Sequence, residues 1–137
     1  MELEKFEIVY YTTYKHPIFL VDGEFIRDNT YIDFTEGGSW LRYPTFIPEG
    51  EIWLDDFNAT ELIRVLIHET AEVTYALEHD LDITQEKDYS EAHDHANEIE
   101  QTARDNPEDR QDILAELLAK LNGTTEEKTL WTQPEKS

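Results

Sequence analysis

The sequence contains no cysteine, which excludes disulfide bonds and thiolate metal ligands. Any metal ion would therefore be bound by histidine, by carboxylate or by backbone oxygen. The chain also lacks an apolar run long enough to cross a membrane, and Met1 to Lys5 do not resemble a signal peptide. We therefore expect a cytoplasmic protein that has no membrane partner.

Basic residues are scarce: Lys and Arg number 11 against 32 Asp and Glu, which gives a net charge of −21 over 137 residues. This charge repels nucleic-acid phosphates, and since no basic patch offsets it, we expect no nucleic-acid partner. The acidic residues are spread along the whole chain. That distribution favours an acidic surface in a high-salt cytoplasm, with an acidic protein of ordinary cytosol as the alternative.

The apolar residues are sufficient for one small core, at 39% of the chain with 12% aromatic. Such a composition predicts a folded protein rather than a disordered one. We expect one domain over residues 1–123, followed by a disordered polar tail over residues 124–137. The oligomeric state does not follow from the sequence.

The residues before position 57 are rich in β-branched and aromatic side chains, which is typical of strands. Asp22-Gly23 predicts a hairpin turn, and Gly37-Gly38 predicts a second turn. In the last strand Ile52 and Leu54 share one face. If that strand lies at a sheet edge, its backbone could bind an extended peptide, and an edge protected by acidic residues is the alternative. The predicted strands cover residues 6–14, 18–21, 24–26, 31–34 and 51–56.

The second half of the chain predicts three helices separated by turn residues. Two capping-box patterns, beginning at Asn58 and at Asp88, mark the starts of the first two helices. Asn106-Pro107 opens the third helix, and Asn122-Gly123 ends it. The fold class is therefore α+β, with a small N-terminal antiparallel sheet followed by three helices. The first two helices cover residues 59–79 and 88–104.

The first predicted helix contains the motif Ile67-His68-Glu69-Thr70-Ala71-Glu72. His68 and Glu72 lie one turn apart on one face, with Glu69 beside them. The helix is apolar around much of its circumference, so burying these three groups without a partner would cost several kcal/mol. A metal ion bound by His68 and Glu72 explains their position. A catalytic zinc site then needs one further protein ligand and a place for water.

The second predicted helix is expected to supply that third ligand. His93 is favoured, because imidazole is the commonest zinc donor and His93 shares a face with Glu100. Glu100 could be a fourth ligand, or it could accept a hydrogen bond that orients a ligand imidazole. Glu98 is the rival third ligand, because Asn97-Glu98 is similar to the Asn-Glu pair of thermolysin-like enzymes.

Three segments together resemble a group of small zincin-like metallopeptidases of archaea, phages and archaeal viruses. The resemblance covers residues 17–104, and the usual His-Glu-x-x-His motif of zincins here ends in Glu72. It implies a zincin-like fold in which His68, Glu72 and His93 hold the metal ion. It also implies that Glu69 is the catalytic carboxylate, and a viral member would act in the cytoplasm of its host. The segments are Glu51 to Asp55, Ile67 to Glu72, and Tyr89-x-x-Ala92-His93-x-x-Ala96-x-x-x-Glu100.

The chemistry that follows is metal-assisted peptide hydrolysis. A zinc ion would acidify a bound water and polarise a carbonyl, while Glu69 would take the proton of the water and pass it to the leaving amine. Tyr75 and His79 follow His68 near the same helical face, so either could donate a hydrogen bond to the oxyanion. The sequence therefore predicts a zinc-dependent peptidase with a peptide or protein substrate. Manganese, iron or nickel would also suit mixed nitrogen and oxygen donors.

Two other functions are compatible with the same residues. A non-catalytic metal-stabilised domain, such as a viral or host-interaction protein, would use the same ligands without needing Glu69. An acidic binding module without metal would hold the cluster as a buried hydrogen-bonded network. Metal analysis separates this module from the other two functions. A Glu69→Gln substitution then separates the peptidase from the non-catalytic domain.

Overall fold

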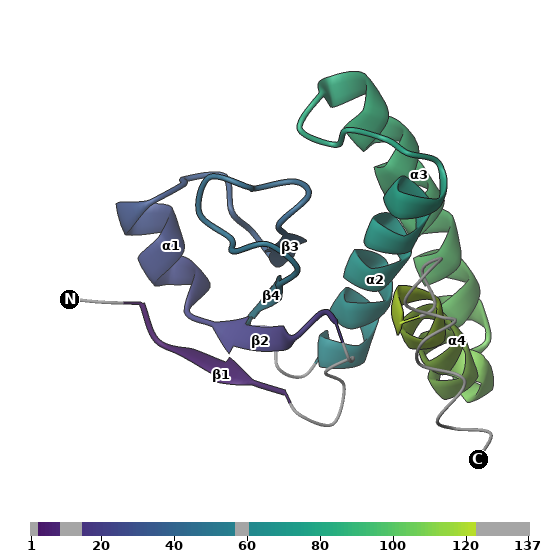
Figure 1. Cartoon of the computed structure of the whole chain (residues 1–137). Helices are drawn as coiled ribbons and strands as arrows, with labels where there is room; N and C mark the ends of the chain where they lie inside the picture. Colours follow the sequence, from purple (N-terminus) through teal and green to yellow (C-terminus); the bar gives the residue numbers. More distant parts are fainter. Residues whose placement is uncertain (1–2, 9–14, 57–60, 123–137) are drawn as a thin grey trace, which may run out of the picture.

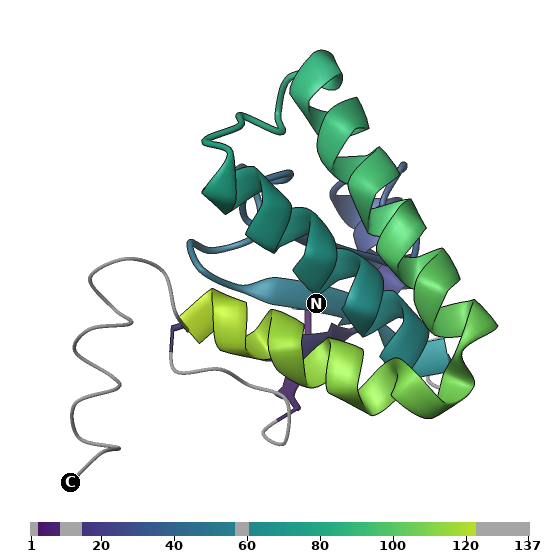
Figure 2. The ribbon, with the colours of Figure 1, turned by 90° about the vertical axis from the view of Figure 1, so that its right-hand side faces the viewer.

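The structure is a computed structural model that describes residues 3–8, 15–56 and 61–122 (Figure 1). Within these ranges a four-stranded sheet and a short helix lie on one side, and three longer helices lie on the other. Figure 2 shows the helix α2 between α3 and α4, with the sheet behind them. The predicted α+β class is confirmed. The helices are α1 (Gly23–Asn29), α2 (Leu62–Glu78), α3 (Glu86–Asp105) and α4 (Arg110–Asn122).

The strands are β1 (Lys5–Glu7), β2 (Ile18–Val21), β3 (Gly37–Ser39) and β4 (Ile52–Asp55). Their order in the sheet is β1-β2-β4-β3. The outer pairings are antiparallel, whereas β2 and β4 are parallel, with Ile18 opposite Ile52. The predicted antiparallel sheet is therefore wrong at its central pairing, because a long connection rather than a hairpin joins these two strands.

The position of β4 inside the sheet excludes the edge strand considered for residues 51–56. Both sides of β4 are engaged by neighbouring strands, so its backbone cannot bind a peptide. Among the described strands, β3 lies at an edge of the sheet and also packs against α2. Any strand addition near the predicted site would therefore use β3.

Gly23–Asn29 form the helix α1, where a turn and a strand were predicted. The Asp22 carboxylate accepts a hydrogen bond from Phe25 N (3.2 Å) and so caps α1. The sequence predicts a hairpin at Asp22 because Asp is common in turns, but Asp is also common at helix starts. Residues 31–34, also predicted as a strand, form a turn instead.

Gly37-Gly38, predicted as a turn, makes up most of β3. Glycine is required there for space rather than for bending the chain. A Cβ atom at Gly38 would lie 2.6 Å from the ring of Tyr43. The tyrosine ring therefore packs directly on the strand backbone.

The three predicted helices are confirmed within the described residues, and a 3₁₀ turn, η2 (Pro107–Asp109), links α3 to α4. The capping box predicted at Asp88 is wrong. The cap of α3 is Gln85, and the Asp88 carboxylate instead accepts from Asp82 N (2.9 Å). No helix in the described ranges has both the length and the apolar character needed to cross a membrane. The predictions for Asn58 and for residues 9–14 and 123–137 lie outside the described residues.

The centre of the core is α2, which packs on the sheet and on both neighbouring helices. Leu66 and Ile67 are fully buried in the cluster that also contains Ile52 and Leu54 of β4. These two strand residues share a face, as predicted, and Trp53 between them belongs to a separate cluster on the opposite face. The predicted site residues of α2 thus lie on a helix that is largely buried at the centre of the core.

Candidate metal centre

Three donor side chains from α2 and α3 meet in one group. His68 and Glu72 lie one turn apart on α2, and His93 lies on α3. His68 Nε2 is 3.5 Å from Glu72 Oε2, and His93 Nδ1 is 3.3 Å from the same oxygen. Donor atoms of the three residues all lie within 4.8 Å of one another, so the group could hold a metal ion. The structure thus brings together the three predicted ligands.

The two donor distances to Glu72 match those around a four-coordinate ion. Zinc binds nitrogen and carboxylate oxygen at about 2.0–2.2 Å in tetrahedral geometry, which places neighbouring donors roughly 3.4 Å apart. The distances of 3.5 and 3.3 Å to the Glu72 oxygen agree with that spacing. A small displacement of these side chains would be enough to accommodate an ion.

Glu100 fixes the orientation of the His68 ring. Its Oε1 atom lies 2.9 Å from His68 Nδ1, whereas the other ring nitrogen faces Glu72. A proton on Nδ1 satisfies the Glu100 carboxylate and leaves the Nε2 lone pair free to bind an ion. Of the two roles predicted for Glu100, the geometry supports the hydrogen-bond acceptor.

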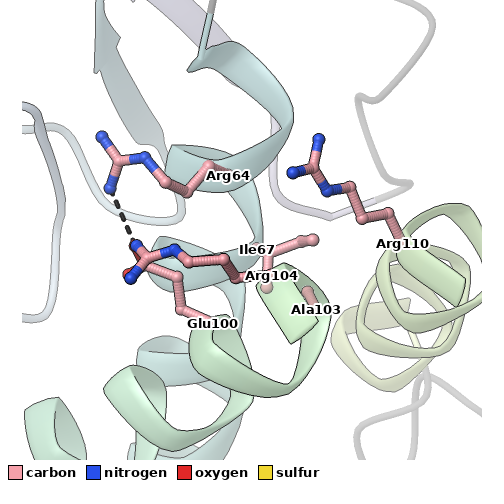
Figure 3. A pocket seen from close by; sticks show the side chains of 6 residues that line it. All are labelled: Arg64, Ile67, Glu100, Ala103, Arg104 and Arg110. Atoms are coloured by element: carbon pink, nitrogen blue, oxygen red, sulfur yellow. Dashed lines mark hydrogen bonds and ion pairs between the residues drawn. The ribbon is translucent and has the colours of Figure 1, made fainter. Parts of the chain in front are cut away.

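Two arginines hold Glu100 in turn. Arg64 Nη1 and Arg104 Nη2 lie 2.8 and 3.1 Å from Glu100 Oε2 (Figure 3). Burial alone would raise the pKa of Glu100, but hydrogen bonds from Arg64 and His68 lower it below its usual value. Glu100 therefore remains an anion beside the His68 ring.

The pocket in Figure 3 lies beside these arginines and is also lined by Ile67, Ala103 and Arg110. Its volume of about 20 Å³ holds a water molecule. None of His68, Glu72 and His93 lines the pocket, so the donor group does not lie in it.

Glu69 is buried beside the three donors, with 6% of its surface exposed. Its Oε1 atom has no hydrogen-bond partner among the described residues. A Cβ atom at Gly37 would lie 3.4 Å from Glu69 Cγ, so the acidic side chain passes close to β3. Burial, followed by the charge of Glu72, raises the pKa of Glu69 to about 8. A carboxylate with such a pKa can exchange protons near neutral pH.

The donors themselves are also electrostatically perturbed. Burial would lower the pKa of His68, but the hydrogen bond and charge of Glu72, with the charge of Glu69, raise it to about 9. Burial would raise the pKa of Glu72, but hydrogen bonds from His68 and His93 lower it. Without an ion, therefore, a protonated His68 faces an ionised Glu72 at neutral pH. An ion would take the place of the proton on His68.

Tyr89 lies one turn before His93 on α3 and completes the surroundings of the group. Its hydroxyl oxygen is 3.4 Å from His93 Nδ1, and the two rings stack with centroids 5.2 Å apart. The guanidinium of Arg42 lies 3.7 Å from the centre of the Tyr89 ring. Burial and then the charge of Glu72 raise the pKa of Tyr89, so the hydroxyl keeps its proton. In the sequence, Tyr89 precedes His93 by four residues, and this helical spacing is the signal that places Tyr89 beside the site.

Three other predicted site residues lie elsewhere. Glu98 is exposed on α3 and is not part of the donor group. The Tyr75 hydroxyl donates to Glu91 (2.8 Å), and the Tyr75 ring stacks on His79 with centroids 4.0 Å apart. The side-chain hydrogen bonds and ring contacts of Tyr75 and His79 within the described residues go to Glu91, to His95 and to each other, and not to the donor group. Their predicted role as oxyanion donors has no support in this geometry.

Comparison of the chain with protein-family models, with curated proteins and with solved structures finds no match. The interpretation of the site therefore depends on the geometry and chemistry of its own residues. The resemblance to small zincin-like metallopeptidases stays a prediction.

Proposed function

We propose that the protein is a zinc-dependent peptidase in which His68, Glu72 and His93 bind the ion. The proposal is carried by one observation: three donors within 4.8 Å of one another lie beside Glu69, a buried carboxylate with an oxygen that has no partner among the described residues. Donors alone would support a structural ion. A neighbouring proton acceptor is the additional group that hydrolysis requires.

Glu69 is the general base and then the general acid of the proposed reaction. The bound ion would lower the pKa of a water molecule and polarise the substrate carbonyl. Glu69 would take a proton from that water while the oxygen of the water forms a bond to the carbonyl carbon. The carbon–nitrogen bond would then break, and Glu69 would give the same proton to the leaving amine. Burial favours the protonated form of Glu69, whereas the charge of a bound ion would favour the ionised form, and this balance suits a carboxyl that first takes and then gives a proton.

The Tyr89 hydroxyl replaces Tyr75 and His79 as the proposed oxyanion donor. It lies 3.4 Å from His93 Nδ1, the atom that would bind the ion, and is therefore close to the proposed reaction centre. When His93 Nδ1 binds an ion, its lone pair can no longer accept the hydroxyl proton. That proton is then available to an oxygen atom in the remaining position.

A peptide substrate would approach the site at Gly37, because Gly38 and Ser39 of β3 are buried. Glu36 O accepts a hydrogen bond from Asp55 N (2.8 Å), so the backbone of the next residue, Gly37, faces away from β4. Glu69 passes beside Gly37, which places the proposed base next to this sheet edge. The net charge of −21 repels acidic peptides, so neutral or basic segments are the favoured substrates.

Metal content and peptide hydrolysis of wild type and Glu69→Gln test the proposal. Wild type is expected to bind one zinc ion and to hydrolyse peptides, whereas Glu69→Gln keeps the ion and loses at least about 100-fold in rate. Glu98→Gln, which removes an exposed carboxylate of α3, is the control and should match wild type in both measurements. Wild type without bound metal, or Glu69→Gln with full activity, would refute the assignment.

A second candidate is a buried polar network that needs no ion. It is favoured by the direct contacts of Glu72 with His68 and His93 and by the hydrogen bond of Glu100 with His68. In that case removing metal with a chelator leaves the thermal midpoint unchanged. A bound ion raises the midpoint instead, since ligands of the native state stabilise it.

A further inference from the structure

Arg64 joins three separate elements of the fold. Its Nη1 lies 2.8 Å from Glu100 Oε2 on α3, and its Nη2 lies 2.7 Å from Glu36 Oε2, immediately before β3. Its Nε lies 3.1 Å from Glu61 Oε1, which precedes α2. The guanidinium thus uses all three nitrogens on different carboxylates, a geometry that a lysine ammonium cannot reproduce.

One continuous path of charge-assisted hydrogen bonds results from this arrangement. It runs from Glu36 through Arg64 to Glu100 and ends at His68 Nδ1, 2.9 Å from Glu100 Oε1. The backbone of Glu36 is itself fixed, because its carbonyl accepts from Asp55 N of β4. The path therefore connects the edge of the sheet with one of the donor residues.

We propose that Arg64 is a positioning residue that holds the His68 ring through Glu100 and ties that orientation to strand β3 through Glu36. This inference rests on the proposed metal site and adds a connection between that site and the proposed substrate strand. A ligand that binds β3 and fixes its position is therefore expected to strengthen ion binding. Because the two binding equilibria are linked, the bound ion strengthens the binding of that ligand by the same factor.

Arg104 provides a matched comparison within the same contact. It bonds to the same Glu100 oxygen at 3.1 Å, but it lies on α3 itself, four residues away, and its side chain is 55% exposed. It therefore cannot join α3 to the sheet. If charge near Glu100 were all that mattered, the two arginines would have similar effects.

Zinc affinity of Arg64→Gln and Arg104→Gln, measured by competition with a chelator on proteins shown to be folded by circular dichroism, tests the inference. Arg64→Gln is expected to weaken zinc binding about 10- to 100-fold, in the range seen for partners that orient a ligand. Arg104→Gln is expected to stay within about threefold of wild type, because its exposed pairing contributes little. Equal effects of the two substitutions would overturn the proposal.

The orientation of His68 provides a readout independent of zinc. In wild type the ¹⁵N chemical shifts of the ring are expected to show the proton of Nδ1 held by Glu100, and in Arg64→Gln this signal is expected to change. Unchanged ring shifts in Arg64→Gln would contradict the positioning role. If wild type fails to bind zinc, the proposed function falls, while the ring shifts still decide whether Arg64 orients His68.

A comparison of Glu36→Gln with Glu61→Gln tests the connection to the sheet while Arg64 stays in place. Each removes one carboxylate partner of Arg64, but Glu36 lies at β3 and Glu61 at the start of α2. Glu36→Gln is expected to weaken zinc binding several-fold more than Glu61→Gln. The reverse order, or no difference, would overturn the tie to β3 even if Arg64→Gln unfolds.

Discussion

Two carboxylates on neighbouring turns of α2 have pKa values that are shifted in opposite directions. Glu72 faces two imidazoles, and their hydrogen bonds lower its pKa despite burial. In the part of the chain that the structure describes, Glu69 Oε1 has no hydrogen-bond partner, and burial with the charge of Glu72 raises the pKa of Glu69 to about 8. Neighbouring acids whose pKa values are driven apart can take different chemical roles. Here one is suited to bind a cation and the other to exchange a proton.

The raised pKa of Glu69 predicts a pH dependence of stability in the metal-free protein. The folded state binds the proton of the Glu69 carboxyl more tightly than the unfolded state does. The contribution of this proton to stability is therefore fully present below the ordinary pKa of 4.5, and it is lost as pH rises through about 8. Relative to Glu69→Gln, the free energy of unfolding of wild type should fall by up to about 1.4 kcal/mol per pH unit in this window. Urea unfolding with a chelator measures it. A constant difference between the two proteins across the window would contradict the prediction.

The raised pKa of His68 predicts that zinc binding releases a proton. At neutral pH the ring is protonated in the metal-free protein, because its pKa is raised to about 9. Apparent zinc affinity should therefore rise about tenfold per pH unit up to that value. Calorimetry in two buffers of different ionisation enthalpy counts the released protons. Identical binding heats in both buffers would show that no proton leaves.

Site residues that are close together in the sequence could be predicted, whereas residues that only the fold brings together could not. The spacing of His68 and Glu72 on one helix directly predicts their shared face. Tyr75 has the right direction on α2 but lies farther along it, where it meets Glu91 instead of the donor group. Arg64 carries no motif, because its role depends on where α3 and β3 cross α2. Such contacts follow from tertiary structure alone.

At the scale of elements, α2 and α3 approach each other over small side chains. Ala71 of α2 and Ala92 and Ala96 of α3 are fully buried. Small residues let two helices lie close together, and this closeness brings the donors of both helices within reach of one ion. The alanines of α3 therefore set the width of the site.

Ala96→Leu is expected to separate the two helices. Inserting a larger side chain into a packed interface should cost about 1–3 kcal/mol of unfolding free energy. Zinc affinity should fall by about tenfold or more, because the donors of α3 move away from those of α2. Ala115→Leu on the exposed face of α4 is the control, with little change in either quantity expected. Urea unfolding and chelator competition give the two values, and unchanged zinc affinity in Ala96→Leu would argue against the alanine spacing.

Helices were easier to predict than strands for a physical reason. The periodicity of α2 and α3 is local, so their existence and approximate ends follow from nearby residues. The parallel pairing of β2 with β4 depends on segments more than thirty residues apart, and no local pattern reports it. The short α1 was mistaken for a strand because seven residues give too little periodicity to distinguish the two.

At the scale of the whole molecule, the net charge of −21 opposes the compact state. Screening is short-ranged at high ionic strength, with a Debye length of about 3 Å at 1 M salt against about 10 Å at 0.1 M. We therefore expect KCl to stabilise the fold by about 1 kcal/mol or more, which corresponds to roughly 4 °C in thermal midpoint. Thermal unfolding between low and molar KCl measures this. A flat or falling midpoint would remove the proposed adaptation to a high-salt cytoplasm.

All three donors belong to a single helical hairpin, with Glu72 and His93 only 21 positions apart. Contacts that close short loops form earlier in folding than pairings between distant strands. An ion present during refolding can therefore be captured by the hairpin before β2 docks on β4. The centre would then act as a nucleus for the rest of the chain, and refolding with zinc would be faster than refolding without it.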